Sequence, residues 1–193
     1  MADASVDRWQ LLVSAALAPS DGDPTVRFCQ LATVDRDGSP YNRTVVIRGF
    51  RSETNELHVV TDARSQKIAH LQETPRVALC WYLTASRQQF RFRGCVTLVD
   101  AAAEGDAQDL RRSTWVALSA RTQGQFLWPA PGTPKTAGAL DNPPPPDTPL
   151  ETFVLLRIYP DVVDHLVLTS IPHQRTLYRL DDTGHWHRHP VNP

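Results

Sequence analysis

Arg43-Thr-Val-Val-Ile-Arg48 is a strand-like run of β-branched residues with an arginine at each end. Successive side chains of a strand point to opposite faces, so Arg43, like Ile47, points one way and Arg48 points the other. A strand that only packs a core has no use for a charge at both ends. We therefore expect the two arginines to serve different faces, one of them reaching a phosphate-bearing ligand.

A second informative segment is Thr61-Asp-Ala-Arg-Ser-Gln-Lys67, which ends one expected strand and begins a helix. Ser65 is a suitable N-cap for that helix. The free N–H groups and the dipole at a helix N-terminus attract anions. If this helix start lies beside the first strand, a single phosphate can be reached by Arg43, Thr61, Ser65 and Lys67.

The alternation of apolar and polar residues elsewhere predicts a mainly β chain with a few helices. Asp35-Arg-Asp-Gly38 is typical of a hairpin turn, and the spacing of successive hairpins favours an antiparallel sheet or barrel. There are no internal repeats. Strands are expected over residues 26–34, 41–50, 56–61, 76–83, 88–100, 153–159, 162–168, 176–180 and 186–191, and helices over residues 5–18, 65–72 and 101–118.

Residues 129–149 are expected to form a loop, because eight of these 21 residues are proline, four of them in the row Pro143–Pro146. Proline excludes regular helix and central strand. The loop also fits a ligand of an SH3-type domain, but a rigid connector, partly polyproline II, is the commoner role.

The composition excludes some classes of partner. The 193 residues carry 20 Lys and Arg against 21 Asp and Glu, a formal net charge of -1. This balance gives no overall attraction to nucleic acid or to an anionic membrane, so neither is an expected partner. No apolar run approaches the roughly 20 residues of a membrane helix, and residues 1–5 lack the basic start of a signal peptide. We expect a single domain over residues 1–193, located in the cytoplasm.

The cysteines and histidines give no metal signature. Cys29, Cys80 and Cys95 each lie in an apolar run, which predicts three reduced, buried thiols. Alternate positions near the C-terminus carry His185, His187 and His189, but no carboxylate or cysteine stands beside them to complete a ligand set. No metal is therefore expected.

Taken in order, these segments resemble the FMN-binding split barrel of the pyridoxamine 5'-phosphate oxidase family. More narrowly, they resemble the subgroup with a Gln-Phe-x-Trp-Pro-x-Pro-Gly segment, here Gln125-Phe-Leu-Trp-Pro-Ala-Pro-Gly132. The resemblance runs from about residue 8 to the C-terminus. It implies a six-stranded antiparallel split β-barrel with flanking helices, and a homodimer that binds FMN at the subunit interface.

The resemblance also implies which residues bind the cofactor. Lys67 matches the family's phosphate-binding lysine, and Gln66 stands where an arginine often precedes it, so Arg64 is expected to restore that charge. The resemblance implies that Gln89 faces the flavin ring and that Arg175 contacts the flavin from the partner side. The full set of predicted cofactor residues is Arg43, Thr44, Val45, Val46, Arg48, Val60, Thr61, Ser65, Gln66, Lys67, Gln89 and Arg175.

The departures from the family concern the substrate. Arg48 replaces the lysine that contacts pyridoxal phosphate, and Ile171-Pro-His173 replaces an Arg-x-His pair. His173 remains as a candidate acid–base catalyst, since histidine titrates near neutrality. Arg121 and Thr122 are further candidates for the substrate pocket. These differences argue against true pyridoxamine-phosphate oxidation.

The expected function is therefore that of an FMN-dependent oxidoreductase with an altered pocket for an unknown small molecule. Two alternatives remain open. One is a non-catalytic protein that stores or senses flavin, which the missing substrate arginine favours. The other is a haem-handling split barrel, which a histidine-rich C-terminus would suit. Trp128 is expected to anchor packing rather than to stack on the flavin.

Overall fold

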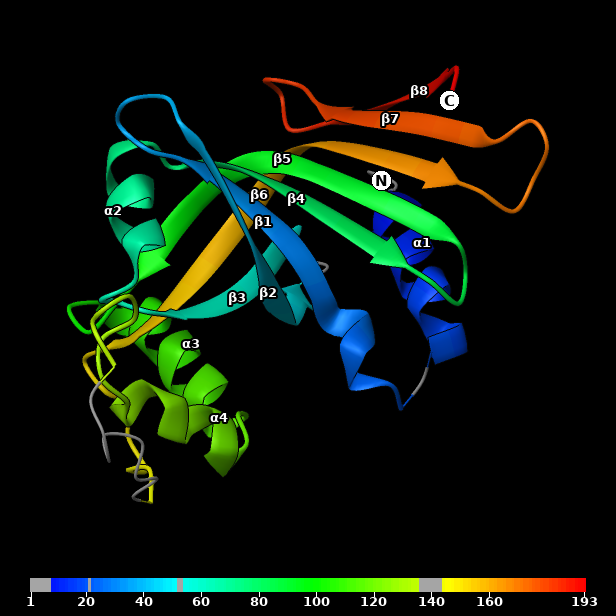
Figure 1. Cartoon of the computed structure of the whole chain (residues 1–193). Coiled ribbons are helices and arrows are strands. Elements are labelled where there is room, and N and C mark those ends of the chain that lie inside the picture. Colours follow the sequence, from blue (N-terminus) through cyan, green and yellow to red (C-terminus); the bar gives the residue numbers. More distant parts are fainter. Residues whose placement is uncertain (1–7, 21, 52–53, 136–143) are drawn as a thin grey trace.

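A computed structural model describes residues 8–20, 22–51, 54–135 and 144–193. Its centre is an antiparallel sheet with the strand order β3-β2-β1-β4-β5-β6-β7-β8, in which β3 also pairs with β6. That pairing closes the first six strands into the predicted split barrel, and the β7–β8 hairpin extends beyond it (Figure 1). The strands are β1 Phe28–Val34, β2 Pro40–Arg51, β3 Glu56–Asp62, β4 Arg76–Leu83, β5 Gln88–Val99, β6 Phe153–Val167, β7 Gln174–Leu180 and β8 Trp186–Val191.

Helices flank the barrel on three sides (Figure 1). The apolar stripe of α1 places Trp9 and Val13 in the main core, where the Trp9 ring meets Phe92 edge-on. On the outer side of β3 and β6, a second apolar cluster joins Trp115 and Phe126 to Phe153. The helical segments are α1 Arg8–Leu17, η1 Ala18–Ser20, η2 Pro24–Arg27, α2 Gln66–Glu73, α3 Gly105–Val116, α4 Ala120–Gly124 and η3 Gln125–Leu127.

The alternation predicted for β2 is confirmed. Val45 and Ile47 are buried in the barrel core, and Arg43 lies opposite the buried Leu31 of β1 on the same face. Arg48 lies on the other face, away from the core. The two arginines therefore serve different sides of the strand.

The predicted break between residues 159 and 162 is wrong, because β6 runs without interruption through Pro160. The register shifts at this point, with Arg93 opposite Val162 and Gly94 opposite Pro160. A Cβ on Gly94 would lie 2.0 Å from the carbonyl oxygen of Tyr159. Proline has no N–H for the ladder, so it is accommodated at a bulge where the glycine lets the two backbones approach.

Other expectations are corrected at element ends. The helix predicted over residues 101–118 is shorter, and a separate α4 follows it. The strand predicted from residue 26 begins at Phe28, because Asp23 caps the short η2 helix. Cys95 is exposed and Cys80 only partly buried, so of the three predicted buried thiols only Cys29 is confirmed.

The described parts of the proline-rich loop have no regular secondary structure. Residues 129–135 and 144–149 contain no helix or strand, as predicted, while residues 136–143 of the proline-rich loop lie outside the described residues. Residues 5–7 of the first predicted helix also lie outside them. No described helix is long and apolar enough to cross a membrane.

Candidate functional site

The strands β2 and β3 part from one another at one end of the barrel. Their pairing starts at Ile47 opposite Val59 and continues to Arg51 opposite Glu56. Residues 40–46 of β2 pair with β1, and residues 60–62 of β3 pair with β6. Within the described chain, the facing backbone edges of residues 43–46 and 60–61 therefore share no ladder, which leaves an opening in the barrel wall.

A cavity of about 430 Å³ lies at this opening, between the two strands and the segment from α4 to Pro131. Most residues predicted for the cofactor line it, and so do Arg48 and Thr122, which are predicted for the substrate. Together these lining residues are Arg43, Thr44, Val45, Val46, Arg48, Val60, Thr61, Lys67 and Thr122. The structure thus brings together residues that are far apart in the sequence.

Lys67, in the first turn of α2, is held by two hydroxyl groups. Its Nζ lies 2.7 Å from Thr61 Oγ1 and 2.8 Å from Ser65 Oγ. Ser65 occupies the N-cap position, but its side chain does not cap the helix and instead faces the lysine. Burial and the positive charge of Arg43 lower the pKa of Lys67 to about 8, with Asp62 opposing them.

Arg43 reaches the same cavity from the barrel interior. Its Nη1 donates to the carbonyl oxygen of Leu31 at 3.1 Å and to Thr33 Oγ1 at 2.8 Å. Burial lowers the pKa of this guanidinium. No ion pair of the described residues includes Arg43 or Lys67. Arg43 and Lys67 therefore share the cavity, and neither forms an ion pair with a described residue.

Asp62 also lines the cavity but is paired with Arg64, at 2.6 Å between Oδ2 and Nη2. The same guanidinium donates to the carbonyl oxygen of Trp128 at 2.9 Å and more weakly to that of Phe126 at 3.4 Å. Arg64 is thus paired with Asp62 and does not line the cavity, so its charge is not directed at the place where Gln66 lacks one. Arg64 instead ties the start of α2 to the wall of the cavity.

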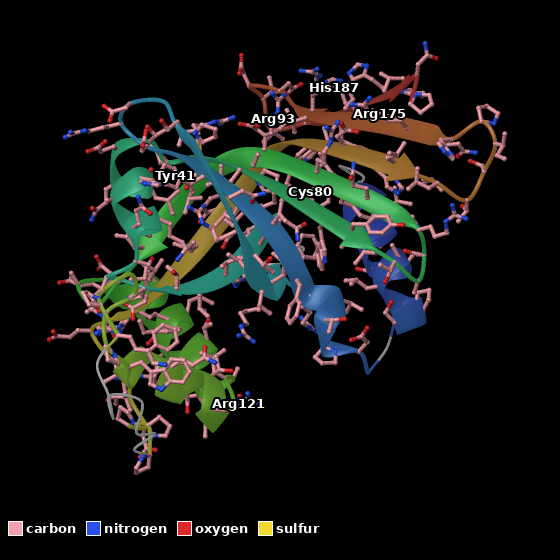
Figure 2. All side chains as sticks on the ribbon, viewed as in Figure 1. Tyr41, Cys80, Arg93, Arg121, Arg175 and His187 are labelled. Carbon is pink, nitrogen blue, oxygen red and sulfur yellow. The ribbon has the colours of Figure 1, made fainter. Side chains whose placement is uncertain are left out.

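Three predicted residues lie exposed and do not line this cavity. Gln66 faces outward from α2, and Arg121 is exposed on α4. His173 is exposed in the loop between β6 and β7, where its Nδ1 lies 2.9 Å from the carbonyl oxygen of Ser170. Figure 2 shows Arg121 and the β7 residue Arg175 at opposite ends of the molecule. Of the predicted substrate residues, Arg48 and Thr122 therefore line the cavity, whereas Arg121 and His173 do not.

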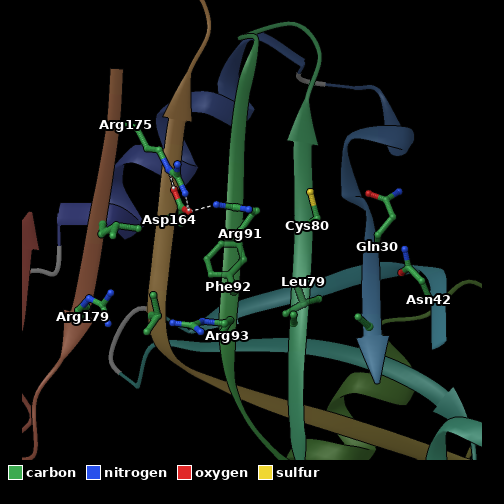
Figure 3. A pocket seen from close by; sticks show the side chains of 14 residues that line it. Gln30, Asn42, Leu79, Cys80, Arg91, Phe92, Arg93, Asp164, Arg175 and Arg179 are labelled. Carbon is green, nitrogen blue, oxygen red and sulfur yellow. Dashed lines mark hydrogen bonds and ion pairs between the residues drawn. The ribbon is translucent and has the colours of Figure 1, made fainter. Parts of the chain in front are cut away.

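Gln89 and Arg175 lie on another face of the sheet. Arg175 lines a separate cavity of about 440 Å³ over the outer side of β1, β4, β5, β6 and β7. Its guanidinium binds Asp164, with Nε 3.0 Å from Oδ1 and Nη2 2.8 Å from Oδ2, and Arg91 contacts the same carboxylate (Figure 3). Gln89 is nearby on β5, where its Oε1 accepts from the Cys80 thiol. Within one chain neither residue lines the cavity of Lys67.

The C-terminal histidines are engaged locally. His187 pairs with Asp181 across the β8 hairpin, and its ring stacks on that of His189. Among the described residues, no group of three or more His, Cys, Asp and Glu side chains has the arrangement of a metal site.

The opposite wall of the cavity comes from the segment after α4. Its Gln-Phe-x-Trp-Pro-x-Pro-Gly pattern by itself predicts no role in binding. Its lining residues are Gln125, Phe126, Trp128, Pro129 and Pro131. The signal was present in the clustering of aromatic and proline residues, since rigid apolar side chains commonly line ligand pockets.

Comparison with known proteins gives a consistent result. Residues 6–100 match the family model for the pyridoxamine 5'-phosphate oxidase, FMN-binding domain. The chain is 31% identical over 193 residues to pyridoxine/pyridoxamine 5'-phosphate oxidase 2 of Arabidopsis thaliana, with 96% of each sequence covered.

Solved structures agree with the sequence match. A pyridoxamine 5'-phosphate oxidase-related, FMN binding protein from Nostoc punctiforme PCC 73102 is 39% identical and superposes with a TM-score of 0.90, over 98% of this chain and 99% of the other. PhzG from Burkholderia lata 383, solved with tetrahydrophenazine-1-carboxylic acid, shares the fold at a TM-score of 0.77 and 18% identity, over 99% and 95% of the two chains. This chain belongs to the pyridoxamine 5'-phosphate oxidase family of FMN-binding split-barrel proteins, and its cofactor is FMN.

Proposed function

We propose that this protein is a homodimeric FMN-dependent oxidoreductase whose substrate differs from pyridoxamine phosphate. The observation that carries the proposal is the pair of cations, Lys67 and Arg43, beside the opening between β2 and β3. A lysine whose pKa is lowered by burial and by a neighbouring arginine is stabilised in its charged form by an anionic ligand. The phosphate of FMN is such a ligand, and Thr61 and Ser65 add hydroxyls to the same cluster.

The flavin ring fits the opening beside that cluster. The backbone edges of residues 43–46 and 60–61 offer N–H and C=O groups that no β2–β3 ladder uses. A flat heterocycle with donors and acceptors along one edge can satisfy such groups. Phe126 and Trp128 supply apolar surface on the opposite wall.

A dimer would complete the site with Gln89 and Arg175. Both lie on the outer face of the sheet, away from the Lys67 cavity of their own chain. Phe28 and Tyr82 are exposed on β1 and β4 of this face, at 45% and 42% of their full area. Exposed aromatic residues of this kind commonly mark an interface between proteins. The face therefore suits a second copy that delivers Arg175 to the flavin.

When bound, FMN supplies the redox chemistry by accepting or giving a hydride equivalent. The protein's own residues bind the phosphate, position the ring and shape the space for the substrate. Arg48 stands at the edge of this space in place of the family's lysine. A guanidinium forms a planar fork, unlike the point charge of an ammonium, so this replacement changes which anion is preferred.

One observation favours the alternative of a non-catalytic flavin binder. Arg121 and His173 are exposed and do not line the cavity, so the predicted acid–base candidate His173 does not stand beside the flavin site of its own chain. Binder and enzyme are separated by mixing the reduced flavoprotein with a panel of acceptors, and the oxidised protein with amines including pyridoxamine phosphate. The absence of turnover across the panel would support the binder.

The first experiment is to measure flavin loading and oligomeric state of the purified protein. We expect the visible flavin absorbance, release of FMN on denaturation, and a dimer in light scattering. An Arg175→Ala variant should keep the fold but alter the flavin spectrum, because its partner group would be lost. A monomer with full flavin loading would contradict the proposed shared site.

A further inference from the structure

We propose that Thr33 and His70 are positioning residues for the cofactor, because they form a buried hydrogen-bond chain that holds the Arg43 guanidinium toward the FMN phosphate. The proposal rests on the place proposed above for that phosphate, beside Arg43 and Lys67. It adds to the site two residues that do not line the cavity and would therefore act on the ligand only through Arg43.

The hydrogen-bond chain crosses three elements of the fold. His70 lies on α2, Thr33 on β1 and Arg43 on β2. The Nδ1 of His70 lies 3.0 Å from Thr33 Oγ1, and Arg43 Nη1 donates to the same oxygen at 2.8 Å. Thr33 is 1% exposed and His70 is 5% exposed. Because both side chains are buried, their polar atoms depend on one another for hydrogen bonds.

The direction of each hydrogen bond follows from the donors available. A guanidinium can only donate, so Thr33 Oγ1 accepts from Arg43. The Thr33 hydroxyl still carries its own proton, which needs an acceptor because it is buried. In the described part of the chain, the other group that contacts this oxygen is His70 Nδ1. Nδ1 is therefore the acceptor, and the imidazole carries its proton on Nε2.

The chain also determines which donors of Arg43 face the ligand. Both of its hydrogen bonds to described residues use Nη1, which donates to Thr33 Oγ1 and to the carbonyl oxygen of Leu31. A guanidinium is planar, so two contacts at one nitrogen fix the direction of its remaining N–H groups. Nε and Nη2 are then left for the cavity that Arg43 lines. A fork fixed in advance loses less conformational freedom when it binds a phosphate.

His70 is itself held by its surroundings. Its ring packs against that of Tyr41 on β2, with 4.6 Å between the ring centroids. Ile68 and Leu71, on the same helix, are buried in the main core. A rotation of α2 would expose these apolar side chains to water, which is unfavourable. The acceptor Nδ1 therefore keeps its position relative to Thr33.

The helix α2 thus contributes to the phosphate site twice. Lys67 lines the cavity directly, and His70 acts through Thr33. Residues three apart in a helix lie on the same side of it, so both contributions come from one helix face. Burial and then the charge of Arg43 lower the pKa of Lys67, which shows that the two cations repel one another. The hydrogen-bond chain keeps Arg43 in place against that repulsion.

The test is a double-mutant cycle read by the Kd for FMN, measured by fluorescence quenching on the full chain after its flavin is removed. Thr33→Val deletes the hydroxyl but keeps the shape of the side chain. We expect it to weaken FMN binding roughly fivefold, the factor that corresponds to one neutral hydrogen bond. In the Arg43→Ala background the same change should have no further effect, because the group through which Thr33 acts is absent. Thr33→Ser keeps the hydroxyl and should bind FMN like the wild type.

A second pair of variants tests His70. His70→Leu removes the acceptor and should weaken FMN binding by a similar factor. His70→Asn keeps an amide close to the position of Nδ1 and should retain most of the affinity. Nitrogen NMR of histidine-labelled protein adds a direct readout, with the His70 signal assigned from the His70→Asn spectrum. Nδ1 should resonate as an unprotonated nitrogen, and a protonated Nδ1 would overturn the proposed chain.

The matched control is Thr97→Val, which changes an exposed threonine on β5 and should leave the Kd for FMN unchanged. Thermal unfolding shows which variants are folded, and the His70 pair decides the question if Thr33→Val is not. Full affinity in Thr33→Val, or the same loss with and without Arg43, would overturn this inference alone. Unchanged FMN binding in Arg43→Ala would instead refute the place assigned to the phosphate, and with it both the proposed site and this inference.

Discussion

The ammonium group of Lys67 lies 2.7 Å from the hydroxyl of Thr61, although one residue belongs to a helix and the other to a strand. This contact fixes the start of α2 against the end of β3, where Arg43 also lines the cavity. The protein thereby holds Lys67 and Arg43 close together, and neither forms an ion pair with another described residue. The repulsion between these two cations lowers the stability of the ligand-free protein. Binding of an anion restores that stability.

Removal of the Lys67 charge should weaken FMN binding. We expect Lys67→Ala to raise the Kd for FMN roughly tenfold or more, because a charge-assisted hydrogen bond contributes about 1.5–3 kcal/mol. Fluorescence quenching of FMN during titration measures this. Lys135→Ala, which removes an exposed lysine, is the matched control and should bind FMN like the wild type. Full affinity in Lys67→Ala would show that the phosphate lies elsewhere.

FMN affinity should also fall as the pH rises through 8. The pKa of Lys67 in the flavin-free protein is lowered to about 8, so the lysine is charged below that pH and loses its proton above it. The phosphate favours the charged form, so binding above this pH requires proton uptake. Titrations between neutral and alkaline pH measure the effect. Lys67→Arg keeps its charge throughout and should flatten the profile. A wild-type affinity that does not change over this range would contradict the assignment.

Arg64 should act as a positioning residue for the cavity wall. Its bonds to the carbonyl oxygens of Phe126 and Trp128 would be lost in Arg64→Ala, and Asp62 would be left without its partner. We expect a loss of about 1 kcal/mol in unfolding free energy and a several-fold weaker FMN affinity. The exposed Arg112 on α3 provides the control Arg112→Ala. If both variants bind FMN alike, the wall does not depend on Arg64.

Gly94 should not tolerate even a methyl group. A Cβ at this position would lie 2.0 Å from the Tyr159 carbonyl oxygen and 2.7 Å from the Pro160 Cα, so β5 and β6 would have to separate. We expect Gly94→Ala to lower the unfolding free energy by about 3 kcal/mol. Gly49→Ala is the control, since its Cβ would meet His58 Nδ1 at an ordinary 3.5 Å. Urea denaturation of the two variants compares them, and equal stabilities would refute the packing argument.

Glu56 should stabilise the fold except in acid. Burial opposes its ionisation, but hydrogen bonds from Arg157, His58 and Thr54 outweigh burial and lower the pKa of Glu56 from 4.5 to about 2. Its contribution is therefore present above pH 4.5 and is lost as the pH falls toward 2, with an upper limit of about 3 kcal/mol. Denaturant unfolding at several acidic pH values should show a steeper decline for the wild type than for Glu56→Gln. The exposed Asp109 supplies the control Asp109→Asn, whose acid profile should follow the wild type.

Much of the fold could be read from local pattern. Alternation of apolar and polar residues located the strands, and the turn at Asp35–Gly38 located the first hairpin. The break expected near Pro160 was wrong because the reason for continuity lies on another strand, in the missing side chain of Gly94. The prediction that Cys95 is buried was also wrong, because Cys95 is exposed. The sequence of a single strand does not reveal which of its two faces other elements cover.

In the candidate site, too, some features follow from local sequence and others only from long-range contacts. The sequence alone determined that Arg43 and Arg48 point to opposite faces of β2, because side-chain alternation in a strand is a local property of the backbone. Only the tertiary structure decided that β2 and β3 part before Ile47, beside Arg43, and that the segment from Gln125 to Pro131 lines the cavity at this opening. It also placed His70 of α2 beside Thr33 of β1. Cavities arise where distant segments pack, and their positions depend on long-range contacts that no local pattern specifies.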